Sequence, residues 1–253
     1  MENKQVLSFV QLNIERNKHL QRFIPLLQRE KPDVVCLQEV IESYIPEIEK
    51  GIGMKVVRFA PMTIWSDNDV NTGIKMGVAI FSRLEAKDIV VDYYVVNGKK
   101  PGEMTFFERG PHQQETIQKV LLSAVFEKDG KEYRIGTTHF TWTPDGEASD
   151  TQREDVQAFL KALSKYPEIV FSGDLNAPRG KEIFETIAKE YHDNIPKDLV
   201  TSIDQELHRV KGIMLMVDSL FSTPGYEVSN VRTTFGVSDH CAIAADIKNI
   251  YQK

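Results

Sequence analysis

The sequence is poor in cysteine: Cys36 and Cys241 are the two cysteines among 253 residues. Two cysteines cannot build the disulfide framework of a small secreted domain. Both lie in apolar runs, which predicts buried thiols in a reducing compartment. No apolar run approaches the roughly 18 residues that span a bilayer, and the run before Asn13 is too short for a signal peptide. We therefore expect a cytoplasmic protein, monomeric and without a membrane span.

The sequence also lacks an excess of basic charge. Its formal net charge is -6, which argues against a protein held on nucleic acid by a broad basic surface. A nucleic-acid enzyme is still compatible with this balance, because a local groove or a bound cation can supply positive charge. The sequence has no Pro/Gly/Ser-rich linker, and 41% of its residues are hydrophobic. We therefore expect one folded domain over residues 1–253.

Two strand–helix–strand units can be predicted from hydrophobic periodicity. The first has a strand over 6–12, a helix over 17–30 and a buried strand over 34–37. The second has a strand over 133–138, a helix over 149–164 and a buried strand over 169–171. Ser149 and Gln152 form a plausible capping box at the start of the second helix. The repeated architecture suggests a pseudo-symmetric fold in which two sheets meet at one site.

Further strand-like runs exceed what a single doubly wound sheet would hold. They cover residues 54–60, 76–81, 88–96, 117–126, 214–221, 226–235 and 241–247. So many strands with few helices favour an α/β fold with two packed mixed β-sheets flanked by helices. Residues 97–118 show no periodicity and are typical of a long functional loop.

Polar residues follow the predicted strands where these end. They are Asn13, Glu39, His139, Asp174, Asn176, Asp218, Asp239 and His240. If the strands pack side by side, these residues share one rim, where the carboxylates repel one another unless a cation neutralises them. Oxygen ligands of this kind favour Mg²⁺ or Mn²⁺ over zinc.

Asp218 is the most informative member of this set. It interrupts the apolar run 214–221, so it should be at least partly buried, and burial costs free energy without a partner. A histidine is the natural partner, because an aspartate can hold an imidazole in one tautomer. Each of the other residues alone also fits a plain structural reading, such as a turn or a solvated strand end, so the argument rests on their joint order.

In that order, six segments of the chain resemble the endonuclease/exonuclease/phosphatase superfamily of metal-dependent phosphoesterases. They are Leu12-Asn13-Ile14, Leu37-Gln38-Glu39-Val40, Thr138-His139-Phe140, Ser172-Gly173-Asp174-Leu175-Asn176, Val217-Asp218-Ser219-Leu220 and Ser238-Asp239-His240. The resemblance implies a DNase I-like, four-layer α/β sandwich. It also implies that Glu39 is the principal ligand of Mg²⁺ or Mn²⁺, with Asn13 and Asp239 beside it.

The resemblance further implies roles in catalysis. Asp174 orients or deprotonates the attacking water, and Asn176 donates a hydrogen bond to the phosphate. His240, paired with Asp218, acts as a general base or as a donor to the phosphoryl oxygens. His139 stands where some family members place a general acid or a second phosphate-binding group. Secreted DNase I-like enzymes pair this histidine with an upstream glutamate, which this sequence does not place.

Three functions are compatible with these residues. The first is a metal-dependent phosphodiesterase or nuclease acting on nucleic acid or a nucleotide-like diester. Candidate substrate contacts are the cations Arg179 and Lys181 and, in predicted loops, the aromatic residues Trp65, Phe106, Phe107 and Trp142. The second is a phosphatase or phosphodiesterase of a small or lipid phosphoester, such as an inositol phosphate, a sugar phosphate or sphingomyelin. The third is a non-catalytic binding module on the same scaffold.

Overall fold

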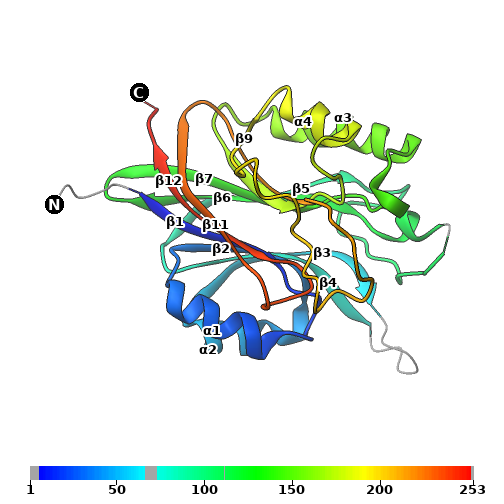
Figure 1. Ribbon diagram of the computed structural model, residues 1–253, viewed down its shortest axis with the longest axis horizontal. Helices are drawn as coiled ribbons and strands as arrows, with labels where there is room; N and C mark the ends of the chain where they lie inside the picture. The colour runs from blue at the N-terminus through cyan, green and yellow to red at the C-terminus, as the bar shows by residue number, and fades with distance from the viewer. Residues whose placement is uncertain (1–5, 66–72, 111, 252–253) are drawn as a thin grey trace.

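The computed structural model describes residues 6–65, 73–110 and 112–251. Two mixed sheets of six strands each pack face to face. Figure 1 shows helices α1 and α2 on the outer face of one sheet and α3 and α4 on the outer face of the other. The fold is therefore a four-layer α/β sandwich, as the sequence predicts.

The first sheet has the strand order β11-β12-β1-β2-β4-β3. Its strands are β1 (Leu7–Asn13), β2 (Val34–Ile41), β3 (Lys55–Trp65), β4 (Ile74–Ser82), β11 (Tyr226–Thr234) and β12 (Ala242–Asn249). Strands β1 and β2 are parallel, and the other described pairs are antiparallel. Helix α1 (Leu20–Glu30) connects β1 to β2, and α2 (Ile45–Ile52) follows β2 after a short 3₁₀ turn.

The second sheet has the order β5-β6-β7-β8-β10-β9. Its strands are β5 (Ala86–Val95), β6 (Lys119–Lys128), β7 (Lys131–His139), β8 (Val170–Asp174), β9 (His192–Asp193) and β10 (Asp218–Ser222). Strands β7 and β8 are its parallel pair. They are connected through α3 (Asp150–Leu163), and α4 (Glu182–Ala188) follows β8.

The centres of the two sheets repeat one arrangement. In β12-β1-β2-β4 and in β6-β7-β8-β10, a parallel pair lies between two antiparallel neighbours. A helix crosses over between the parallel strands in each case. The predicted strand–helix–strand units are these two crossovers, so the expected architectural repeat is confirmed.

Apolar side chains fill all three interfaces between the layers. Alternate residues of β1 show why: Phe9 packs between the sheets, whereas Val10 packs under α1. Phe171 of β8 packs under α3 and α4. Burying each such side chain contributes about 1.5–3 kcal/mol. The three apolar interfaces therefore fix the positions of the layers, and with them the strand ends, relative to one another.

The bounds of several elements differ from the sequence prediction. Helix α1 begins at Leu20 instead of residue 17, because Glu15 and Arg16 adopt left-handed backbone angles before it. Strand β10 begins only at Asp218, because the peptide groups of Met216 and Val217 bond to the segment after β8 instead of joining the sheet. The long loop includes a 3₁₀ turn at Gln113–Thr116.

Only half of the predicted capping box forms at α3. The Ser149 hydroxyl accepts a hydrogen bond from the backbone N–H of Gln152. The Gln152 side chain does not return to Ser149; it donates to the carbonyl oxygen of Thr141 at 2.6 Å. Gln152 thus ties the helix to the segment after β7, which is near the site described below.

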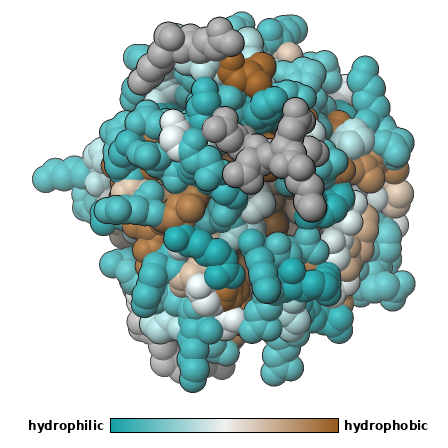
Figure 2. Space-filling model, turned by 90° about the vertical axis from the view of Figure 1, so that its left-hand side faces the viewer, coloured by the Kyte–Doolittle hydropathy of each residue, from teal (hydrophilic) through white to brown (hydrophobic). Residues whose placement is uncertain are grey.

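The surface is predominantly polar where Figure 2 shows it. On that face, which is the left-hand side of Figure 1, hydrophobic residues appear as separate small patches among hydrophilic ones. No helix in the described part of the chain has the length and apolar character to span a membrane.

Candidate active site

The polar residues singled out in the sequence lie at one end of both sheets. Parallel strands β1 and β2 end there, as do β7 and β8. The antiparallel strands β10 and β12 begin there. The two-sheet packing therefore brings residues more than 200 positions apart in the sequence into hydrogen-bonding contact.

A bulge in β2 positions Glu39. The register between β2 and β4 shifts between Leu37 and Val40, and Glu39 has a left-handed φ of 56°. A bulge of this kind adds one residue to the strand and redirects its side chain. Gln38 points between the sheets and donates to the Thr137 hydroxyl at 2.9 Å, while Glu39 remains at the rim.

Asp174 is the centre of the hydrogen-bonded cluster. Its Oδ2 accepts a hydrogen bond from Asn13 Nδ2 at 3.0 Å. The Nε2 atoms of His139 and His240 lie 3.5 and 3.8 Å from the same oxygen. Its Oδ1 accepts from the backbone N–H of Asn176 at 2.8 Å. Asp174 is thus held by both of its oxygens and lies between two histidines.

His240 and Asp218 form the expected buried pair. The distance from Nδ1 to Asp218 Oδ2 is 2.7 Å, and Asp218 Oδ1 accepts from Gln11 Nε2 at 3.0 Å. Burial raises the pKa of the Asp218 carboxyl, but the charge and hydrogen bond of His240 outweigh it and lower the pKa. Burial disfavours the His240 imidazolium, yet Asp218 and Asp174 together raise its pKa well above the usual value. The two carboxylates therefore favour the protonated form of the His240 imidazole.

The remaining members of this cluster respond differently to burial. Burial lowers the pKa of His139 to about 4, so this imidazole is neutral at pH 7. Burial raises the pKa of Asp174 above its ordinary value. Of the two neighbouring histidines, His240 has a carboxylate bonded to its far nitrogen, which favours its charged form, whereas burial favours the neutral form of His139.

Asn13 lies at the end of β1, as expected, but the sequence does not show how its side-chain amide is oriented. Its Nδ2 faces Glu39 Oε1 at 3.4 Å as well as Asp174, and its Oδ1 accepts from the backbone N–H of Glu15 at 3.1 Å. Asn13 therefore orients the carboxylates in this structure, and its role as a metal ligand stays a prediction. The Asn176 side chain likewise donates to the Phe140 carbonyl at 3.2 Å.

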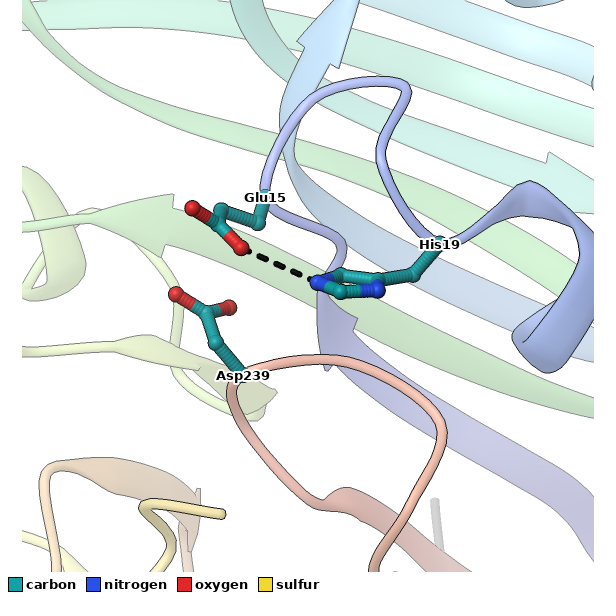
Figure 3. Close-up of side chains that lie close together, drawn as sticks. All are labelled: Glu15, His19 and Asp239. Carbon is teal, nitrogen blue, oxygen red and sulfur yellow. Dashed lines mark hydrogen bonds and ion pairs between the residues drawn. The ribbon is translucent and has the colours of Figure 1, made fainter. Parts of the chain in front are cut away.

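Acidic groups gather on the other side of Asn13. Burial raises the pKa of Asp239, and the negative charges of Glu39 and Glu15 raise it further. Arg16 bonds to Glu39 Oε2 at 3.0 Å and lies 3.3 Å from Glu15 Oε1. Figure 3 shows Asp239 pointing toward Glu15, which is hydrogen-bonded to His19. This oxygen-rich set fits a hard divalent cation such as Mg²⁺ or Mn²⁺.

The sequence prediction missed Glu15, Arg16, His19 and Lys119. Glu15 had a usable signal, since it lies two residues after Asn13 at the same strand end. Lys119 is buried on β6, and its Nζ donates to the Phe140 carbonyl at 3.4 Å. Desolvation lowers its pKa to about 8. The positive charge of Lys119 also contributes to the lowered pKa of His139.

The two cationic candidates have different surroundings. Arg179 forms an ion pair with Asp193 at 3.0 Å and donates to loop carbonyls, so its guanidinium is engaged within the fold. Lys181 pairs with Glu147 at 2.6 Å near the surface. The contact of Lys181 with substrate stays a prediction.

The aromatic candidates divide into two groups. Trp65 ends strand β3 instead of lying in a loop, is 8% exposed, and stacks on Phe107 at 4.9 Å between ring centroids. The Arg16 guanidinium lies 4.8 Å from the Trp65 ring centre. Phe106 and Trp142 are 43% and 44% exposed. Phe106 and Trp142 are thus the more exposed of the aromatic candidates.

The two packed sheets and the rim of carboxylates and histidines define a DNase I-like α/β sandwich. A model of the endonuclease/exonuclease/phosphatase family matches residues 10–240. The chain belongs to this family. Its members are in general phosphoester hydrolases. No curated protein matches the chain by sequence.

Solved structures share the fold at low sequence identity. A family protein from Beutenbergia cavernae has a TM-score of 0.74 and 16% identity over 97% of this chain and 72% of its own. The human Nocturnin catalytic domain with bound sulfate has a TM-score of 0.70 and 15% identity, covering 98% and 96%. D. rerio TDP2 complexed with single-strand DNA product has a TM-score of 0.67 and 15% identity, covering 97% and 100%.

Proposed function

We propose that this protein is a divalent-metal-dependent phosphodiesterase acting on nucleic acid or a nucleotide-like diester. The observation that carries the proposal is Asp174, held between His139, His240 and Asn13 beside a group of carboxylates. A carboxylate fixed by both oxygens and flanked by donors is suited to orient a water molecule for in-line attack. Fixed donors at the same place oppose the negative charge that develops on the phosphoryl oxygens.

Each residue takes the role that its contacts support. Asp174 orients the attacking water and accepts its proton. His240 donates to a phosphoryl oxygen, while Asp218 behind it stabilises the imidazolium. Asn176 keeps Asp174 in place through its backbone N–H. His139, neutral beside Asp174, serves as a second hydrogen-bonding group for the phosphate.

Glu39 and Asp239 would hold the metal ion. The Oδ2 atom of Asp239 accepts no hydrogen bond from the residues that the structure describes, although Asp239 is only 9% exposed. Burying a carboxylate charge with one hydrogen-bond donor is costly, and a cation would offset that cost. When bound, the metal supplies charge that stabilises the developing phosphoryl and leaving-group oxygens.

The preference for a nucleotide-like diester rests on two observations. Phe106 and Trp142 offer exposed rings on which bases can stack. The D. rerio TDP2 structure, which shares this fold, contains a single-strand DNA product. Fold similarity alone does not determine the substrate, so the experiment must compare substrate classes directly.

A substrate panel tests the proposal. Purified protein with Mg²⁺ or Mn²⁺ is assayed on a bis-nitrophenyl diester, a nitrophenyl monoester, single- and double-stranded DNA, abasic DNA, RNA, inositol phosphates and sphingomyelin. We expect hydrolysis of diesters, abolished by EDTA. Activity confined to monoesters would favour the phosphatase alternative, and activity that survives EDTA would reject the metal dependence. Binding without turnover on any substrate would favour the non-catalytic module.

Two substitutions test the residues. Glu39→Gln and His240→Ala should each lower turnover by about 10²–10⁴-fold with the fold retained, because one removes a metal ligand and the other a fixed donor. Circular dichroism and thermal unfolding check the fold. The matched histidine control is His208→Ala, at a half-buried histidine whose Nδ1 lies 2.8 Å from the Val210 carbonyl oxygen. Near-normal turnover in either test variant would refute the proposed site.

A further inference from the structure

A cluster of metal-ligating side chains lies next to Glu39, beyond the residues that the family motifs indicate. One ligand atom each from Glu15, His19 and Asp239 lies within 4.8 Å of the others. They come from the turn after β1, the start of α1 and the turn before β12. Two of the three, Glu15 and His19, belong to none of the motif segments described above.

The backbone holds both of these side chains in place. Glu15 and Arg16 have left-handed φ values of 45° and 66° in succession, a conformation that costs about 1–3 kcal/mol per residue and gathers at functional sites. His19 is the N-cap residue of α1, and its carbonyl oxygen accepts from the N–H groups of Arg22 and Phe23. The imidazole is thus attached to a rigid helix start.

The two oxygens of Glu15 have different partners. Lys18 and Arg16 approach Oε1, whereas Oε2 lies 2.9 Å from His19 Nε2. Asp239 points toward these atoms (Figure 3), and its Oδ1 accepts a hydrogen bond from the Ser238 hydroxyl at 3.1 Å. One ligand atom from each of the three side chains therefore lies within reach of a single cation.

The mixture of ligand atoms selects among cations. Mg²⁺ prefers an all-oxygen shell with several waters. Imidazole nitrogen suits transition metals, and Mn²⁺ accepts it together with carboxylates. With side-chain exposures of 11% for His19 and 12% for Glu15, water competes poorly for the same positions.

We propose that His19 is a nitrogen ligand of the active-site metal, together with Glu15 and Asp239, and that it makes the site prefer Mn²⁺ over Mg²⁺. The proposal rests on the proposed function only in placing this metal at the catalytic rim. Metal binding would replace the hydrogen bond between His19 Nε2 and Glu15 Oε2. The His19 imidazole would then be neutral with its proton on Nδ1, so that Nε2 can bind the ion. His19 is therefore a metal-positioning residue with no direct part in the proton transfers of the reaction.

Pulsed electron paramagnetic resonance of bound Mn²⁺ tests the ligand directly. With one equivalent of Mn²⁺, the wild-type protein should show modulation from a directly coordinated ¹⁴N nucleus. His19→Ala should lose it, whereas His240→Ala, His139→Ala and His208→Ala should keep it. Should His19→Ala fail to fold, His19→Gln replaces it. Modulation that persists without His19, or wild-type protein that binds Mn²⁺ without nitrogen modulation, would overturn the proposal.

Calorimetric titration measures the selectivity. We expect His19→Ala to weaken Mn²⁺ binding by about tenfold or more and Mg²⁺ binding by roughly twofold at most. Equal weakening for both ions would contradict a nitrogen ligand. Neither readout requires turnover, so the two proposals can fail separately. Hydrolysis without nitrogen modulation would remove only the His19 ligand, and modulation without hydrolysis would remove only the phosphodiesterase activity.

Discussion

The pKa values of individual residues in the site depend on neighbouring charges that the fold buries. The clearest contrast is between His139 and His240, which face the same Asp174 oxygen. Burial lowers the pKa of both imidazoles, but His240 also has Asp218 bonded to its other nitrogen, and Asp218 together with Asp174 raises its pKa. Neighbouring carboxylates thus give the two histidines opposite pKa shifts.

Lys119 permits a test of burial through the pH dependence of stability. Its pKa of about 8 lies below the value of about 10.4 for an unfolded lysine, because desolvation disfavours the charged form. Below pH 8 the native state bears the cost of the buried charge. Between pH 8 and 10.4 the unfolded state binds the additional proton, so stability rises with pH. The increase attributable to Lys119 should be about 3 kcal/mol.

Urea denaturation of the wild type and Lys119→Met across this pH range measures the effect. The stability of Lys119→Met relative to the wild type should be greatest near pH 7 and decrease by about 3 kcal/mol toward pH 10.4. Lys99→Met, at an exposed lysine, should show a difference that does not change with pH. A constant difference for Lys119→Met would contradict the lowered pKa.

At the scale of the secondary-structure elements, close approach of β7 and β8 positions the central aspartate. A Cβ atom on Gly173 would lie 1.9 Å from the Thr138 carbonyl oxygen, and Gly173 has a φ of 148°. Only glycine permits this approach and this backbone conformation. Asp174 follows directly, so its position beside His139 depends on the missing side chain.

Gly173→Ala should therefore impair both stability and activity. We expect a loss of at least about 2 kcal/mol in the free energy of unfolding, because the backbones of β7 and β8 must move apart to admit the added Cβ atom. Gly130→Ala is the matched control, since Gly130 has a φ of 74° but open space around it, and it should cost about 1 kcal/mol with activity retained. Equal costs for the two variants would show that the contact with Thr138 is unimportant.

At the scale of the whole molecule, the active site is also the junction of the two sheets. Among the described residues, side-chain hydrogen bonds cross between them at this end from Gln11 to Asp218, from Gln38 to Thr137 and from Asn13 to Asp174. The partners within each bond come from different sheets. The candidate site residues Asn13, Asp174 and Asp218 thus also stabilise the packing of the sandwich.

Metal binding should therefore stabilise the folded protein as a whole. A divalent ion at about 100 times its Kd contributes about 2.7 kcal/mol, which corresponds to a rise in Tm of roughly 5–10 °C for a chain of this size. Differential scanning calorimetry with and without Mn²⁺ or Mg²⁺ measures the shift. A Glu39→Gln/Asp239→Asn variant should lose it. A full shift in that variant would indicate that the ion binds elsewhere.

The sequence by itself determined the class of fold and most of the polar rim. Hydrophobic periodicity and turn chemistry act over short distances, so the two strand–helix–strand units and the residues at their ends were predictable. The burial of Asp218 and its histidine partner followed from one charge in an apolar run, and the structure shows that pair at 2.7 Å. The start of β10 was predicted four residues too early, because its pairing depends on a distant strand.

Only the tertiary structure decided which atoms face one another. The bulge at Glu39 and the inward amide of Asn13 depend on how neighbouring strands and the two sheets pack. The use of Arg179 as an internal ion-pair partner likewise depends on contacts between segments distant in the chain. Local sequence patterns specify elements, whereas distances between side chains follow from the packing of layers, and it is these distances that produce the site's chemistry.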